Sequence, residues 1–320
     1  MTYRSSFHSW DERASVRRRP VRRPEASRGT ELFFPPEYAP WVDHPLVAER
    51  GPRARFELLV HALHQYLNFT TVLEQVAILP VTLRLARGLG SSGVDIPPAM
   101  RTDAFRITTD EAWHAQFCHE FMIEVGRRTG TPPVAIVDPA FAAELDQART
   151  SFGDSHRALA DLTFACVSET LISGFLASVP RDTRLPKPVR ELIADHASDE
   201  GRHHAFFRSF LKQLWPALDD AERALVGRHV PQFLHTFLAP DPAGADSALA
   251  ELGFSATQRA TILGDVMEGW TTHTRDAHAL AAAGTVRAFA DVGALDLAEV
   301  RDAFEAAELL PVLELPASVG

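Results

Sequence analysis

Cysteine, charge-free apolar stretches and strand-like alternation are all scarce in this chain. Its 320 residues include two cysteines, Cys118 and Cys166, each within an apolar helical run. We therefore expect packing residues rather than a disulfide, and a thiolate metal centre is excluded. No apolar run of about 20 residues is free of charge, so no membrane span is expected. No segment alternates convincingly between polar and apolar residues, which favours an all-α fold.

Basic residues are concentrated at the start of an otherwise acidic chain. The formal net charge is −10, and 46% of the residues are hydrophobic, enough for a sizeable buried core. Residues 1–30 include RASVRRRPVRRPEASR without an apolar signal stretch, so we expect a flexible basic arm there and a single helical domain over residues 31–320. An acidic protein with one short basic arm is a poor binder of nucleic acid. The composition agrees with a cytoplasmic location.

Glycine and proline divide the rest of the chain into helical segments. Breaks are expected at GLGSSGVDIPP, RRTGTPP, PRDTRLPKP and APDPAGAD. One further proline, Pro80, should kink or locally open the helix that contains it. The expected helices cover residues 53–88, 101–129, 138–149, 152–178, 187–214, 219–238, 255–282 and 296–308.

The pentapeptide Asp-Glu-x-x-His occurs twice, at residues 110–114 and 199–203. On a helix, residues three apart lie on one face, so each Glu-His pair can offer a carboxylate and an imidazole to one ion. A four-helix bundle that binds two metal ions needs two such pairs and one Glu from each of two further helices. Glu74 and Glu169 are suitable, because each is a lone acid in an apolar helical run. The pattern therefore predicts one dinuclear metal centre.

The repeated pentapeptide is more specific than either copy alone. With 42 acids and 14 histidines, an acid three residues before a His is expected by chance roughly twice. Requiring another acid directly before the first reduces the chance expectation to roughly 0.24. The alternative interpretation is that Glu111 and Glu200 are solvated helix acids beside ordinary histidines.

A third histidine refines the interpretation. His196 lies four residues before Glu200 and seven before His203, almost on the same helical face. Taken alone, a His at this position is more often a partly buried helix residue than a ligand. Together, however, HxxxExxH and the other acids resemble the diiron arylamine N-oxygenases, which convert aromatic amines to nitro compounds in antibiotic biosynthesis. The resemblance covers most of residues 50–280. It implies seven iron ligands, namely Glu74, Glu111, His114, Glu169, His196, Glu200 and His203.

This resemblance implies a ferritin-like four-helix bundle core with additional C-terminal helices. It also implies an O2-dependent non-haem diiron oxygenase that oxidises an amine, usually an arylamine, toward a hydroxylamine, nitroso or nitro product via a peroxo-diferric intermediate. The cofactors would be two Fe ions that cycle between Fe2+ and Fe3+, with O2 as co-substrate and an external electron donor. The expected partners are a small-molecule amine, an electron-donating reductase or ferredoxin, and a second copy in a homodimer. Carboxylate and imidazole ligands suit manganese as well as iron.

Four further residues are candidates for supporting roles. In the diiron carboxylate families, an Asp directly before the ligand Glu accepts a hydrogen bond from the ligand His of the opposite pair. We therefore expect Asp110 to bond His203 and Asp199 to bond His114; the alternative is two exposed helix acids. Tyr66 and Arg275 are candidate substrate-binding residues. The first is as consistent with a core tyrosine, and the second with a surface ion pair.

Two other functions fit the same ligand pattern. One is a diiron hydroxylase or desaturase that acts on carbon, because fold and ligands do not fix the substrate. The other is a non-catalytic ferritin-like protein that binds iron. About a hundred residues follow His203, and this length favours an enzyme whose substrate pocket needs walls.

Overall fold

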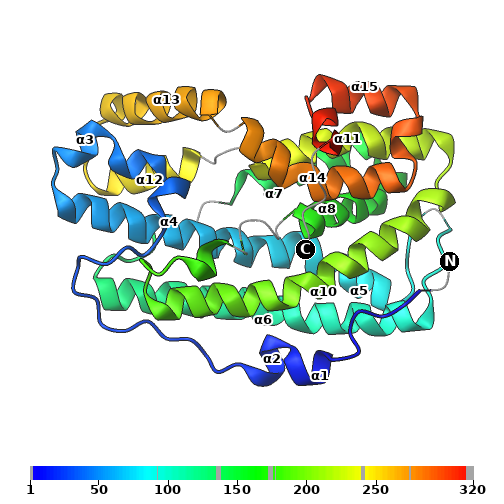
Figure 1. Ribbon diagram of the computed structural model, residues 1–320, viewed down its shortest axis with the longest axis horizontal. Coiled ribbons are helices and arrows are strands. Elements are labelled where there is room, and N and C mark those ends of the chain that lie inside the picture. Colours follow the sequence, from blue (N-terminus) through cyan, green and yellow to red (C-terminus); the bar gives the residue numbers. More distant parts are fainter. Residues whose placement is uncertain are drawn as a thin grey trace.

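The helices that contain the expected ligands run side by side through the middle of the molecule (Figure 1). The computed structural model describes residues 3–91, 93–134, 138–171, 176, 178–238, 242–273 and 275–314, without the side chains of residues 269–280. Within these ranges the secondary structure is helical and contains no strand. The all-α fold class is therefore confirmed.

Two of the central helices are each more than 30 residues long. α6 (Pro98–Thr129) begins with a proline and ends at Gly130, whose φ of 73° is left-handed. Proline suits the first turn of a helix because its missing N–H has no helical partner there, and glycine suits the left-handed residue that ends one. α10 (Lys187–Ala217) likewise has a proline in its first turn. Each of these helices contains one copy of the repeated pentapeptide.

The helix expected over residues 53–88 is one continuous run with a local defect. α4 (Pro52–Leu73) passes through a π-helical turn, η3 (Glu74–Ile78), into α5 (Leu79–Ala86). The irregularity expected from Pro80 is thus present, because a proline leaves the carbonyl four residues before it without its helical donor. The π-helical turn begins at one of the expected ligands.

Packing joins these helices with α8 (Arg157–Leu171) into the central bundle. α4 and α5 pack along α6, and α8 packs against α10. Around α8 lie α7 (Ala140–Phe152), α11 (Asp220–Leu238) and α14 (Arg275–Asp291), with α15 (Ala298–Ala306) against α11. At the other end of the molecule, α12 (Pro242–Glu251) packs on α4 and α13 (Ala256–His273) on α12 (Figure 1). The segment APDPAGAD, expected as a break, contains the first turn of α12.

The start of the chain packs against the bundle, which differs from the flexible arm expected there. Two single-turn helices, α1 (Trp10–Arg13) and α2 (Ser15–Arg18), lie below α6 and α10 in Figure 1. Phe7, Trp10 and Ala14 are buried, at intervals of three and four residues. This helical spacing of apolar residues lets the segment cover the bundle while most of its arginines face solvent and Arg22 pairs with Asp195 of α10. We call residues 3–23 the N-terminal strap.

One continuous run, Pro52–Ala86, is long and apolar enough to cross a membrane by length and composition. However, 61% of its most apolar window is buried inside the protein. A core helix meets the same criteria, and this run contains the buried carboxylate of Glu74. The packing therefore agrees with the expectation that this run is not a membrane span.

Candidate metal centre

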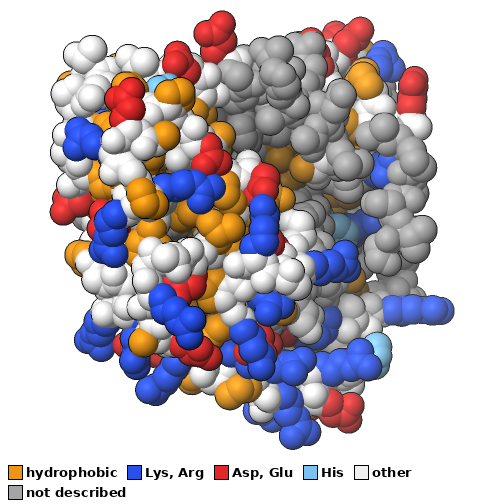
Figure 2. Space-filling view, turned by 60° about the vertical axis from the view of Figure 1, so that its left-hand side comes forward, with side chains coloured by type: hydrophobic (Ala, Val, Ile, Leu, Met, Phe, Trp, Pro, Cys, Tyr) orange, Lys and Arg blue, Asp and Glu red, His pale blue; other side chains and the backbone are white. Residues whose placement is uncertain are grey.

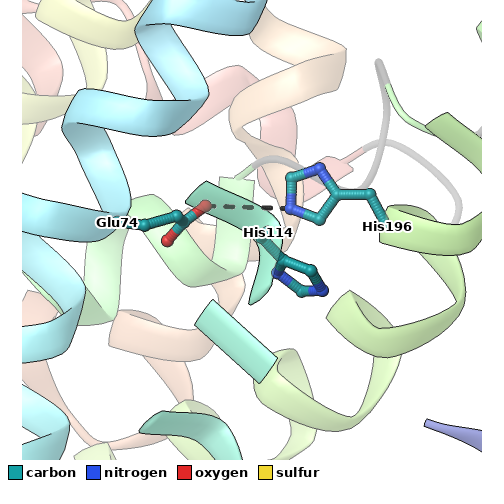
Figure 3. Close-up of side chains that lie close together, drawn as sticks. All are labelled: Glu74, His114 and His196. Atoms are coloured by element: carbon teal, nitrogen blue, oxygen red, sulfur yellow. Dashed lines mark ion pairs between the residues drawn. The ribbon is translucent and has the colours of Figure 1, made fainter. Parts of the chain in front are cut away.

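The seven expected ligands converge in the middle of the bundle. Their ligand atoms form two groups, and within each group the atoms lie within 4.8 Å of one another. In Figure 3, Glu74 points from its helix toward His196 of α10, and His114 of α6 lies beside them. All seven side chains are buried. One group is Glu74, His114 and His196, and the other is Glu111, Glu169, Glu200 and His203.

Helical spacing brings the ligands of each helix onto one face. On α6, Glu111 Oε2 lies 2.9 Å from His114 Nδ1, one turn further along the same face. On α10, His196 Nε2 lies 2.9 Å from Glu200 Oε1 and His203 Nδ1 lies 3.4 Å from the same oxygen. The three α10 residues therefore occupy one face, as the sequence predicted.

The centre contains more ligand atoms than the protein itself can satisfy. Such buried and unpaired polar atoms are costly, because each has lost water without gaining a partner. Carboxylate oxygens and imidazole nitrogens that converge in this way fit a divalent transition-metal ion. Among the described residues, the buried cluster atoms without a well-aligned hydrogen bond are Glu74 Oε2, Glu111 Oε1, Glu169 Oε2, Glu200 Oε1, His196 Nε2 and His203 Nδ1.

Crowding of acids in the centre shifts their proton affinities. Burial raises the pKa of Glu74 and Glu169 well above the usual value, and repulsion from Glu111 and Glu200 raises it further. Burial alone would lower the pKa of His203, but the same two carboxylates raise it well above the ordinary histidine value. Bound cations would replace these protons as the compensating positive charge.

Both expected bonds between an Asp and the opposite His are present. His114 Nε2 donates to Asp199 Oδ2 at 3.1 Å, and His203 Nε2 donates to Asp110 Oδ2 at 3.2 Å. Burial would raise the pKa of Asp199, but the hydrogen bonds from His114 and Ser15, together with the charges of His114 and His203, lower it to about 2. Because Nε2–H faces the aspartate in each pair, Nδ1 of each imidazole faces the other ligand atoms.

The N-terminal strap supports these aspartates from outside, a contact that sequence reasoning missed. Trp10 Nε1 lies 2.9 Å from both carboxylate oxygens of Asp110. On the other side, the backbone N–H of Ser15 lies 3.2 Å from both oxygens of Asp199, which also accepts from Arg202. The helical spacing of Phe7, Trp10 and Ala14 within the arginine-rich stretch is the sequence feature that could have indicated this contact. Each expected ligand pair is thus supported by one Asp and one strap residue.

Replacing either aspartate by Asn should weaken metal binding without unfolding the bundle. In Asp110→Asn and Asp199→Asn, the shape is kept but the negative charge behind the imidazole is lost. Loss of such a partner costs about 10- to 100-fold in metal affinity. Competition with a chelator would measure it. Glu120→Gln is the matched control, because Glu120 is an exposed acid of α6 that lies outside the centre. Equal affinities in all three variants would contradict the role assigned to these aspartates.

Of the two expected substrate-binding residues, the structure describes the side chain of Tyr66 but not that of Arg275. Tyr66 lies on α4, with a buried hydroxyl and its ring centroid 6.1 Å from that of Phe34. Burial raises the pKa of Tyr66 well above 10, and Glu200 and Glu74 add to the shift. The residue is therefore within electrostatic reach of the centre. The side chain of Arg275 lies outside the described part of the structure.

Two further histidines of α4 are buried but do not join the centre. His61 and His64 are 2% and 3% exposed, and their rings meet edge to face with centroids 5.9 Å apart. Neither nitrogen of His64 has a hydrogen-bond partner among the described residues. Burial, with a smaller contribution from His61, lowers the pKa of His64 from 6.5 to about 3. His64 is therefore neutral in the folded protein at neutral pH.

This neutral histidine should make the protein less stable in mild acid. Because the folded pKa of His64 lies below 6.5, the unfolded chain binds the proton first as the pH falls, and stability decreases. Between pH 7.5 and pH 5.5 the contribution of one such group is a loss of about 1.4 kcal/mol. Urea unfolding at the two pH values would measure it.

In His64→Leu this part of the pH dependence should disappear, because the variant has no group to titrate. His235→Leu serves as the control, since His235 is exposed. If His64→Leu and wild type lose the same stability between the two pH values, the assignment of a neutral buried His64 is wrong.

Comparisons with known proteins match most of the chain. The model of the family described as p-aminobenzoate N-oxygenase AurF matches residues 7–293, a range that includes the centre and most of the strap. A curated relative, the 4-aminobenzoate N-oxygenase of Streptomyces thioluteus, is 25% identical over 251 residues. That alignment covers 76% of this chain and 72% of the relative.

Proposed function

Because the chain belongs to the p-aminobenzoate N-oxygenase AurF family and is an N-oxygenase, we propose that it oxidises the nitrogen of an arylamine at a diiron centre. O2 is the co-substrate, and the products are the hydroxylamine, nitroso or nitro compounds. Membership in this family removes the non-catalytic alternative. The curated relative, named for oxidation at nitrogen, favours nitrogen over carbon as the site of attack.

The observation that supports this proposal is the convergence of four buried carboxylates and three imidazoles. Four carboxylates balance the four positive charges of two ferrous ions, so the loaded centre can be buried without a large cost. The two groups of ligand atoms match two ions, and the unpaired buried atoms supply the lone pairs. The ligand set fits iron, and manganese shares its preference for such ligands.

The protein's own part in the reaction is to hold and shield the centre. Two iron ions, when bound, supply the redox chemistry that activates O2. Glu111 spans the two imidazoles, with Oε2 2.9 Å from His114 Nδ1 and Oε1 2.9 Å from His203 Nδ1. Asp110 and Asp199 fix the orientation of those imidazoles. Both histidines are 0% exposed, so the packing excludes water from this side of the centre.

Product analysis tests the function. The protein, loaded with Fe2+ under nitrogen, would receive 4-aminobenzoate, a chemical reductant and 18O2. The expected products are 4-hydroxylaminobenzoate and its nitroso and nitro successors, with 18O on nitrogen. Benzoate, which lacks the amine, should remain unchanged. Oxygen on a ring carbon, or no product from any arylamine, would contradict the proposal.

A further inference from the structure

The N-terminal strap is a positively charged surface on an acidic protein. Residues 1–30 include eight arginines and three acids, whereas the whole chain has a formal net charge of −10. Arg13 and Arg18 are exposed and form no ion pair among the described residues, while Arg17 pairs with Asp11 at 3.0 Å. Lys and Arg side chains gather along the lower edge of the view in Figure 2, the edge at which α1 and α2 lie in Figure 1.

This charged surface lies directly over the candidate metal centre. Trp10, in α1, is 8% exposed, and its indole N–H reaches Asp110 at 2.9 Å. Asp110 in turn accepts from His203 at 3.2 Å. Two hydrogen bonds therefore connect the N-terminal strap, through the buried Trp10, with an imidazole of the centre.

Two arginines lie close to the indole ring of Trp10. The guanidinium of Arg17 lies 5.2 Å from the centre of the Trp10 ring, and that of Arg106 lies 5.9 Å from it. Both of these guanidinium groups are paired, with Asp11 and Asp103, so the exposed Arg13 and Arg18 would attract a negatively charged protein to the surface above Trp10. Clustered charge of one sign steers an oppositely charged partner to such a point and raises the association rate.

The proposed reaction needs electrons from outside the protein. Oxidation of an amine to a hydroxylamine by O2 consumes two electrons and two protons: one oxygen atom is inserted into an N–H bond, and the other is reduced to water. We propose that the N-terminal strap is the docking surface of an acidic electron-carrier protein that delivers these electrons. This inference rests on the proposed function, because a centre that did not reduce O2 would need no carrier.

Charge and position together identify the kind of partner. Nucleic acid would also be attracted to arginines, but outside residues 1–30 the chain is strongly acidic and repels a long polyanion. A small acidic protein can match the local patch alone. Iron–sulfur ferredoxins of the plant type carry one electron at a low reduction potential, which suits reduction of a ferric centre.

The test uses an acidic plant-type ferredoxin as the probe and the full-length, iron-loaded protein. Affinity would be measured by calorimetry at about 0.01 M salt, where the Debye length is about 30 Å. Removing two cations in Arg13→Gln/Arg18→Gln should weaken binding on the order of tenfold. The matched control is Arg157→Gln/Arg301→Gln, which removes two exposed arginines from α8 and α15 and should leave the affinity unchanged.

A second readout follows the electrons. The rate at which reduced ferredoxin reduces the ferric centre under nitrogen, at ferredoxin concentrations below saturation, should fall with the affinity in the strap variant. Reduction by the small viologen radical should be unchanged, because that reductant needs no docking surface. Both readouts monitor binding or reduction rather than product formation.

Three results would overturn the proposal. These are equal losses in the two double variants, no binding of ferredoxin at low salt, and tighter binding of a DNA duplex or of anionic vesicles than of ferredoxin. N-oxidation driven by a chemical reductant tests the proposed function separately from the docking surface. If that activity is present and ferredoxin does not bind, the docking surface is wrong and the proposed function stands.

Discussion

Replacement of Glu111 by Ala is expected to lower the iron content from about two ions per chain to about one and to abolish N-oxidation. The carboxylate of Glu111 lies between the two histidines that belong to different groups of ligand atoms, 2.9 Å from each. Its removal therefore affects both groups, whereas each keeps some ligands of its own. Dinuclear centres of this kind take one Glu-x-x-His pair from each of two helices. Elemental analysis after loading would measure the iron content.

Glu120→Ala is the control for this experiment, because Glu120 is an exposed acid on the same helix. It should keep the iron content and activity of the wild type. The bundle itself should survive the loss of Glu111, because α6 packs against its neighbours through buried apolar residues such as Ile107 and Phe121. A Glu111→Ala protein that still binds about two ions would show that this carboxylate is not a ligand.

His196→Ala should keep the fold and most of the iron but lose N-oxidation by about 10- to 100-fold. His196 Nε2 lies 2.9 Å from Glu200 Oε1 and 3.8 Å from Glu74 Oε1, so it belongs to the same centre as those acids. Six of the seven proposed ligands remain in the variant. Iron content and the yield of N-oxidised product, measured on one preparation, would test this expectation.

A histidine that only packs would behave differently. Its loss would cost about 1 to 2 kcal/mol of stability, the common range for a point change, and would leave the oxidation of the amine unchanged. His119→Ala, an exposed position of α6, controls for general effects of losing a histidine. Unchanged product formation in His196→Ala would leave a six-ligand centre and would remove the feature that distinguishes this family in the sequence.

The arrangement of the centre could be predicted from sequence because helical periodicity fixes it. Residues three, four and seven positions apart on one helix share a face, so the spacing of His196, Glu200 and His203 was enough to place them together. Glu74 and Glu169 were recognised because a lone acid in an apolar run requires a partner. The two Asp-His bonds were expected because, in the diiron carboxylate families that the pattern resembles, an Asp directly before the ligand Glu bonds the opposite His.

The position of the N-terminal strap could not be predicted in the same way. Trp10 and Asp110 are 100 residues apart, and Ser15 and Asp199 are 184 apart, so no local spacing relates them. The composition indicated a flexible arm instead of a packed segment, because an arginine-rich stretch with prolines is typical of disorder. The buried residues of the strap are few, and their helical spacing was masked by the surrounding charge. α12 was missed for a related reason, since its prolines and glycine favour a turn.

The proposed diiron centre requires that these seven side chains hold two iron ions. Diffraction from crystals of the iron-loaded protein, recorded on both sides of the iron absorption edge, would locate the metal directly. The expected result is two anomalous peaks per chain, one beside Glu74, His114 and His196 and the other beside Glu111, Glu169, Glu200 and His203. No peak at this position in fully loaded protein, or peaks only elsewhere in the chain, would contradict the diiron centre.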